Sequence, residues 1–480
     1  MALPGYSVII GERPANTAFP SNTATGIMVG FSERGSTESV IEILSPADAQ
    51  AKLGNRIATS PTHYDSIEAF FREGGGRLLF SRIDPGSALA AKELVDTESK
   101  KDLKVVAKSK GSWGNNIKVA VTNASSKFKL EVKYENVVVE VSPEFSAEEE
   151  AITWAATYSA YINIINEAES AAIPKTQEIT LAGGTYAPGS VTGTQKKEAI
   201  ERINKDLGPG QIALPGETSE EIHKALLEHA AANNRRAILD DVDTATYAEI
   251  ASHATILRGT SAKFGTMVAP YAKIPGLTIG TTRTIPYSAI YMAQIARSQA
   301  EGNNPNVAAA GRKRGACLWA TELTQTYTNA GLKALNEAGV IAAKYVRGVP
   351  TTFGNVTLVN QTTEPNWKSF SASRLIMGVA ALASEVCETF EFEQIDAHGH
   401  TFSAFQTALS NIACMPYYNA DALYGNSPPE AFEVNIGPDV NTPASIAAEE
   451  LKAQISLRVS PTGEVITVEV VKVPITEGLV

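Results

Sequence analysis

Three absences narrow what this protein can do: cysteine is scarce, basic runs are missing and long apolar runs are missing. Only Cys317, Cys387 and Cys414 occur in 480 residues, which argues against a disulfide framework and favours synthesis in a reducing compartment. Lys and Arg number 41 against 52 Asp and Glu, so the formal net charge is −11. An acidic chain without a basic run is poorly suited to bind nucleic-acid phosphates. The apolar stretch in the C-terminal third is broken at Ser384 and Glu385, short of the roughly 20 residues that a membrane helix needs.

The sequence also lacks the motifs of nucleotide-binding and nucleophilic enzymes. It contains no GxxxxGK[ST] loop, no GxGxxG at a strand-to-helix turn and no GxSxG elbow. The turn at 216–221 carries three glutamates, which would repel a phosphate. The densest basic cluster, 312–314, is predicted to be a solvated loop or an ion-pairing patch for an acidic neighbour. The three cysteines lie in apolar contexts and are predicted to serve packing. No cofactor is expected, and the first residues lack the pattern of a signal peptide.

Two clusters could bind a metal ion. Asp240, Asp241 and Asp243 follow an expected strand, where a metal-dependent α/β enzyme could hold its ion. We favour the alternative that Asp241 or Asp243 caps the next helix and the others are solvated. His398 and His400 could both bind zinc, but no further ligand lies near them in the sequence. A turn before a helix is the favoured interpretation of that pair.

Hydrophobic periodicity predicts two kinds of folded unit. Strands and helices alternate in the first and middle parts of the chain, which predicts a parallel α/β sheet. The expected elements are strands 25–31 and 77–83 around a helix that begins at Ser60 and Pro61, then strand 211–215, helix 217–234, strand 236–240, helix 245–257 and strand 264–270. Between them, segments of period two predict an antiparallel module. Its expected elements are strands at 117–121, 127–134 and 137–141 and a polar helix at 147–169.

The C-terminal third is expected to contain helices 371–390 and 401–415, the second ended by Pro416. Strands 451–459 and 465–473 flank a turn at 460–463 and are predicted to form a hairpin.

Both ends of the chain carry strands without an obvious local partner. Residues 6–10 (YSVII) are bounded by Pro4-Gly5 and Gly11. In the last strand, alternate apolar residues share one face. Such strands suit addition to the sheet of another subunit, although the two ends could equally pair with each other. The predicted arm residues are Tyr6, Val8 and Ile10 at the start and Ile466, Val468 and Val470 at the end.

Several segments, in order along nearly the whole chain, resemble contractile bacteriophage tail sheath proteins. They are 4–8 (PGYSV), 25–35 (TGIMVGFSERG), 70–77 (FFREGGGR), 111–119 (GSWGNNIKV), 181–185 (LAGGT), 235–240 (RRAILD), 285–293 (IPYSAIYMA) and 331–339 (GLKALNEAG). The chain departs from the family pattern at Tyr287, which is inserted between Pro286 and Ser288, and at 319–321, which reads WAT where the family usually has PAN.

The resemblance implies a structural protein and not an enzyme. Subunits of this family stack in six-membered rings around a tail tube, form a helical polymer and contract to drive the tube through the host envelope. The implied partners are other copies, the tail tube protein, and the baseplate and tail terminator proteins, with no nucleic acid or membrane. The implied location is the tail sheath of a virion, after synthesis in the host cytoplasm. The same role in a tailocin or an extracellular injection system is an open alternative, and a metal-dependent enzyme around Asp240 is a distant one.

The implied architecture is a multidomain α+β or α/β protein with a sheath core, an inserted β domain and terminal strand arms. The expected units are an arm at 1–24, the first part of the core at 25–86, the inserted β domain at 87–180, the α/β sheath domain at 181–355, an inner domain at 356–462 and a strand arm at 463–480. Since the C-terminal part lies innermost in the family, Lys368 and Arg374 are the predicted tube-facing residues.

Overall fold

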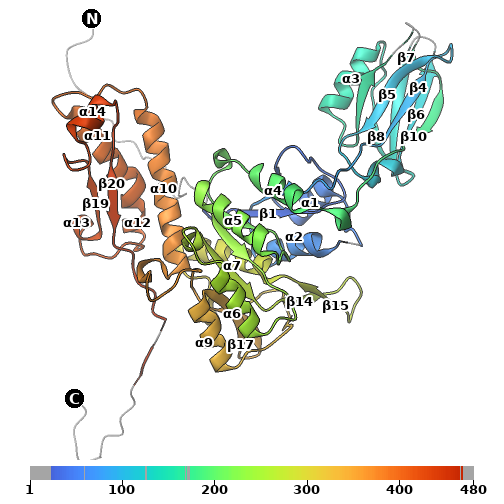
Figure 1. Cartoon of the computed structure of the whole chain (residues 1–480). Helices are drawn as coiled ribbons and strands as arrows, with labels where there is room; N and C mark the ends of the chain where they lie inside the picture. The colour runs from blue at the N-terminus through green and yellow to red at the C-terminus, as the bar shows by residue number, and fades with distance from the viewer. Residues whose placement is uncertain are drawn as a thin grey trace, which may run out of the picture.

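The computed structural model describes residues 23–58, 60–124, 127–167, 169, 173–464 and 466–468. It has three parts: a central body, an antiparallel β domain on one side and a helical C-terminal unit on the other (Figure 1). The expected mixed fold, with a parallel sheet and an inserted antiparallel domain, is confirmed.

The central body is built on an eight-stranded sheet that joins segments far apart in the sequence. Strand β1 (Gly26–Gly30) pairs in parallel with both β11 (Gln211–Ala213) and β3 (Leu78–Arg82). Two edge strands run antiparallel. The strand order is β18-β17-β13-β12-β11-β1-β3-β2, and the remaining strands are β2 (Ile41–Ile43), β12 (Arg236–Leu239), β13 (Gly265–Ala269), β17 (Val340–Val346) and β18 (Val349–Phe353).

Helices cover both faces of this sheet, which explains why its central strands carry apolar residues on both faces. Along β1, Met28 belongs to one core cluster while Ile27 and Val29 belong to the other, as strand alternation requires. The first face is covered by α2 (Thr62–Arg72) and α7 (Tyr287–Gly302). The second is covered by α4 (Gly193–Glu201), α5 (Glu220–Ala232), α6 (Tyr247–Ile256) and α9 (Asn329–Ala338). The body also contains α1 (Pro46–Leu53), α8 (Gly311–Arg314) and a small sheet of β14 (Ala272–Pro275), β15 (Thr282–Ile285) and β16 (Glu322–Leu323).

Two predicted helix starts in the body are wrong. The helix expected to begin at Ser60 and Pro61 begins at Thr62, with Pro61 as its N-cap residue and no side-chain cap. The α6 helix is capped by Thr246, which forms a reciprocal capping box with Glu249, so neither Asp241 nor Asp243 caps it. A Thr followed three residues later by Glu is a stronger capping signal than an isolated Asp, because both side chains satisfy free N–H groups.

The inserted domain consists of two small antiparallel sheets. One has the order β10-β6-β7-β8 and the other β4-β5-β9. The polar helix expected at 147–169 ends at Thr157, and strand β9 (Ile162–Asn166) follows it. The Ser159 hydroxyl accepts the N–H groups of Tyr161 and Ile162 and so stabilises the turn. The other elements are β4 (Ala91–Val95), β5 (Lys101–Ala107), β6 (Ile117–Ala124), β7 (Lys127–Tyr134), β8 (Val137–Val141), α3 (Glu148–Thr157) and β10 (Gln177–Thr180).

The C-terminal unit packs short elements against the long helix α10 (Phe370–Phe390). By length and composition α10 could cross a membrane, but 56% of its apolar window is buried inside the fold, as in a core helix. Pro416 does not end the second helix: a π-helical stretch, Leu409–Cys414, leads into α12 (Met415–Asn419). Pro is tolerated there because the first helical N–H groups lack an intrahelical partner. The unit also contains α11 (His400–Ala408), α13 (Pro428–Ala431), β19 (Phe432–Asn435), α14 (Pro443–Ala447) and β20 (Gln454–Leu457).

Candidate functional site

The strongest candidate for an assembly site is the small sheet of the C-terminal unit. Strands β19 and β20 pair antiparallel, from Phe432 opposite Leu457 to Asn435 opposite Gln454. One face packs on the helices of the unit through Val434, which is buried, and Ile455, which is half-buried. Within the described residues this sheet holds only these two strands. Two strands are a marginal sheet by themselves.

The outer edges of this sheet differ in how they are covered. In antiparallel pairing, alternate residues direct their N–H and C=O groups away from the partner strand. On β19 the Val434 carbonyl accepts a hydrogen bond from the Gln406 side chain at 2.7 Å. On β20 no described strand pairs with the edge opposite β19. This edge of β20 is therefore open to a strand from elsewhere.

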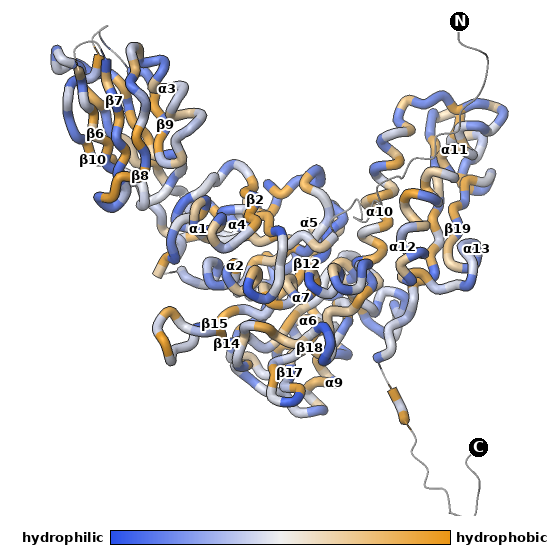
Figure 2. Tube along the Cα trace, turned by 180° about the vertical axis from the view of Figure 1, so that it is seen from behind, coloured by the Kyte–Doolittle hydropathy of each residue, from blue (hydrophilic) through white to orange (hydrophobic). Residues whose placement is uncertain are grey.

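The chain after β20 leaves the folded body. Among the described residues, Ser460 is the last with a backbone–backbone hydrogen bond, donating its N–H to Ala422 O at 3.0 Å, and Glu464 pairs with Lys368 at 3.1 Å. Beyond it, the side chains of Ile466 and Val468 are 82% and 76% exposed. Figure 2 shows residues 466–468 as a short apolar segment separated from the body. Apolar side chains at alternate positions, held in solvent, are those expected of a strand that lacks its partner.

The first strand of the hairpin predicted from 451–459 and 465–473 is present as β20, and it pairs with β19. Most of the second strand, residues 465 and 469–473, lies outside the described residues, so its pairing stays a prediction. Residues 466–468 form no strand in the structure as described. Tyr6, Val8, Ile10 and Val470 lie outside the described residues, so their assignment as arm residues stays a prediction.

The two predicted tube-facing residues differ in their exposure to solvent. Lys368 remains on the surface, with its side chain 38% exposed. Arg374 is only 1% exposed, and its guanidinium donates to the Gln299 side chain at 2.7 Å. Burial lowers the pKa of Arg374 to about 10. This burial contradicts the prediction that Arg374 contacts a tube, because the first turns of α10 are embedded in the body.

The three aspartates after β12 do not converge. Asp240 is buried and accepts hydrogen bonds from Ser288 N at 3.0 Å, from the Ser288 hydroxyl and from Gly216 N at 3.1 Å. Asp241 lies 3.2 Å from the His253 ring, and Asp243 accepts the Thr324 hydroxyl. Burial raises the pKa of Asp240 to about 6, and its hydrogen bonds oppose that shift. Each carboxylate has a separate structural partner, so the geometry does not form the metal site considered above.

Replacing Asp240 with alanine is expected to destabilise the fold and leave metal content unchanged. The substitution leaves the buried N–H of Ser288 and the partly buried N–H bond of Gly216 without an acceptor, which costs about 3 kcal/mol. Urea unfolding of both proteins, with metal analysis of each, checks this. If the wild type instead contains a stoichiometric metal ion that Asp240→Ala lacks, the result would support a metal-dependent enzyme.

The His398 and His400 rings lie 6.0 Å apart. No group of three or more His, Cys, Asp or Glu side chains suited to a metal occurs in the part of the chain that is described. Asp396 accepts the N–H groups of Thr401 and His400, and these bonds hold the pKa of Asp396 well below its usual range. The residues before α11 thus form a capped turn.

Two of the three cysteines serve packing as predicted. Cys317 and Cys414 are buried, and burial raises the pKa of each thiol to about 12. Cys387 is exposed, which contradicts the prediction that it serves packing.

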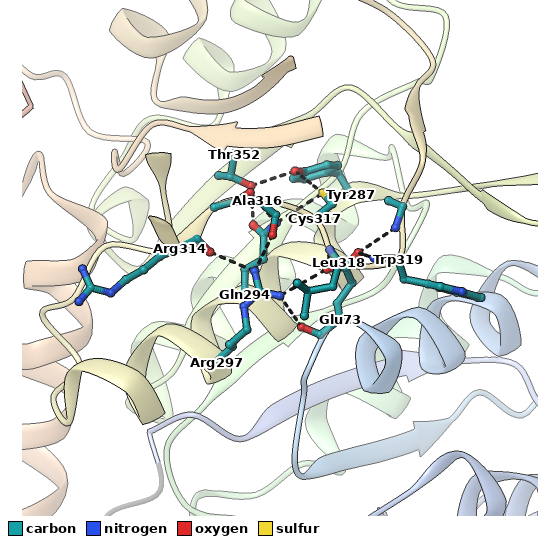
Figure 3. Close-up of polar contacts among 12 residues, drawn as sticks. Glu73, Tyr287, Gln294, Arg297, Arg314, Ala316, Cys317, Leu318, Trp319 and Thr352 are labelled. Carbon is teal, nitrogen blue, oxygen red and sulfur yellow. Dashed lines mark hydrogen bonds and ion pairs between the residues drawn. The ribbon is translucent and has the colours of Figure 1, made fainter. Parts of the chain in front are cut away.

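A buried polar cluster at the end of α2 was not foreseen. The Glu73 carboxylate is fully buried and accepts the backbone N–H groups of Leu318, Trp319 and Ala320 at 2.7, 2.8 and 2.9 Å (Figure 3). Arg297 on α7 lies 3.6 Å from Glu73 and donates to Ala316 O at 2.6 Å. The cluster fixes the segment 314–320 on the body. The only signal in the sequence is a single Glu before three glycines, which does not indicate a partner more than 200 residues away.

The chain resembles several solved sheath structures over most of its length. No protein-family model and no curated protein matches the sequence. A sheath tail protein from Listeria innocua superimposes with a TM-score of 0.63 at 15% identity, covering 86% of this chain and 89% of that one. One from Desulfitobacterium hafniense gives 0.57 at 16% identity, covering 90% and 93%. The sheath complex of an extracellular contractile injection system, PVC, in the contracted state gives 0.57 at 14% identity and covers 98% of both chains. This chain therefore has the fold of contractile sheath proteins.

Proposed function

We propose that the protein is the sheath subunit of a contractile tail, which polymerises around a tail tube in stacked hexameric rings and shortens to drive the tube through a cell envelope. One observation carries the proposal: the chain has both an open strand edge on β20 and an exposed apolar segment at 466–468. The similarity to a contracted sheath complex supports the same role.

The mechanism rests on strand addition between copies. A strand from a neighbouring copy, added to β20, would satisfy that strand's outward N–H and C=O groups and bury alternate apolar side chains. Such contacts can persist while the bodies rotate, because the donated strand is joined to its own body only by the extended segment after Ser460. The energy for contraction would then come from new contacts between bodies, without nucleotide hydrolysis.

The proposed partners are further copies of this chain, a tube protein, a baseplate and a tail terminator. Lys368 is the remaining candidate for tube contact. A phage tail, a tailocin and an extracellular injection apparatus place the same demands on the subunit. Neighbouring genes distinguish them, because capsid and terminase genes indicate a phage.

Electron microscopy of the purified chain, with and without its tube protein, tests the proposal. We expect regular hollow tubes with a helical repeat, since an acceptor edge and a donor segment on the same chain allow indefinite addition. Monomers under both conditions, from protein that is folded by circular dichroism, would contradict the sheath assignment.

A further inference from the structure

Apolar side chains gather at the β17–β18 margin of the central sheet. Leu318, Phe353 and Val349 are 65%, 48% and 41% exposed. Segment 315–317 continues the sheet beside β18, through Cys317 N to Pro350 O at 2.9 Å and Thr352 N to Gly315 O at 2.8 Å. Leu318 directly follows this segment, so all three apolar residues lie along one margin.

Cations surround these apolar side chains. Lys344 lies on β17 with its ammonium 3.3 Å from the centre of the Phe353 ring, and Arg347 is exposed in the β17–β18 turn. Arg312 lies on α8, which packs against β18. Among the described residues, no carboxylate lies within ion-pairing distance of Arg312, Lys344 or Arg347. We call Leu318, Val349, Phe353, Arg312, Lys344 and Arg347 the edge patch.

The buried cluster of Figure 3 holds this patch in place. Glu73 binds the N–H of Leu318 at 2.7 Å, and Arg297 donates to the carbonyls of Arg314 and Ala316 at 3.2 and 2.6 Å. A surface that is already ordered loses little conformational entropy when it binds. The edge patch is thus a preformed surface that combines cations with apolar side chains.

The opposite charge is concentrated in another part of the chain. Residues 356–464 contain thirteen Asp and Glu but four Lys and Arg, a net charge of −9 out of the chain's −11. Four exposed carboxylates lie at or just beyond the end of α10: Glu385, Glu388, Glu391 and Glu393. The last turn of α10 has no basic residue, although the negative end of a helix dipole favours cations. This acidic end therefore favours a cationic partner.

The two surfaces cannot meet within one chain. Both views show α10 leading away from the body, with its C-terminal end far from β17 and β18 (Figures 1 and 2). Different surfaces that bind between copies make a head-to-tail contact, which produces rings or helical filaments. We propose that the edge patch of one copy docks against the acidic end of α10 in a second copy. The inference rests on the proposed assembly function and adds a contact between bodies to the exchange of strands.

Charge reversal on each side, measured by sedimentation velocity at low and high salt, tests this contact. One double variant reverses the cations of the edge patch, Lys344→Glu with Arg347→Glu, and a second reverses the acidic end, Glu388→Lys with Glu391→Lys. Each should weaken self-association at least about tenfold, because like charges then face each other. The four substitutions combined restore opposite charges and should return the affinity to within about threefold of the wild type. Self-association of the wild type should weaken as salt rises.

Lys127→Glu with Lys129→Glu is the matched control. It makes the same charge change on exposed residues of the inserted domain and should leave association unchanged. Association that is insensitive to salt and to both reversals overturns the docking contact, even where microscopy shows normal tubes. Failure of the combined variant to recover also overturns it, provided circular dichroism shows that the variant is folded. Absence of tubes together with a successful charge swap would count against the sheath function alone.

Discussion

A chain truncated after Val465 is expected to fold normally and fail to polymerise. Ile466 and Val468 are 82% and 76% exposed, so removing them takes away little buried apolar surface and little stability. If the tail is the strand that a neighbouring copy receives at β20, its removal leaves that edge unpaired in every copy. Thermal unfolding of the truncated chain, together with electron microscopy under the conditions that give wild-type tubes, measures both expectations.

Point substitutions in the tail separate a missing strand from a merely shortened chain. Ile466→Asp with Val468→Asp places charges on the face expected to be buried and should abolish tubes. Thr467→Asp introduces a charge on the opposite face of the strand and should preserve them. Normal tubes from the truncated chain, or equal loss from Thr467→Asp, would contradict strand exchange through this tail.

The sequence predicted elements well where a local pattern determined them. The strands expected at 127–134 and 137–141 are β7 and β8, residue for residue. The parallel pairing of strands in the body was also predictable, because strands and helices alternate there at βαβ spacing. In these segments the side-chain period and the turn residues agree.

Partners distant in the sequence could not be predicted in the same way. β19 has four residues, and its pairing with β20 depends on how α10 to α12 fold beneath it. The sequence pattern offered 465–473 as a local partner for β20 and did not indicate β19. Arg374 looked like a surface cation at a helix start, but its burial depends on α7 and Gln299. The open edge of β20, which would accept a strand, could therefore be identified only from the structure.

The largest loss of stability is expected from Glu73→Ala. This side chain is fully buried and is the shared acceptor of three backbone N–H groups, with Arg297 at 3.6 Å. Removing it leaves those donors and a partly buried cation without their carboxylate, which costs about 3–5 kcal/mol. Glu73→Gln should lose less stability, because one amide oxygen can still accept the two bonds that Trp319 and Ala320 make to a single carboxylate oxygen.

Glu228→Ala, on the exposed face of α5, is the control and should change the free energy of unfolding by less than about 0.5 kcal/mol. Urea unfolding of the three variants gives these values, and a change below about 1 kcal/mol for Glu73→Ala would show that segment 314–320 is held by its other contacts.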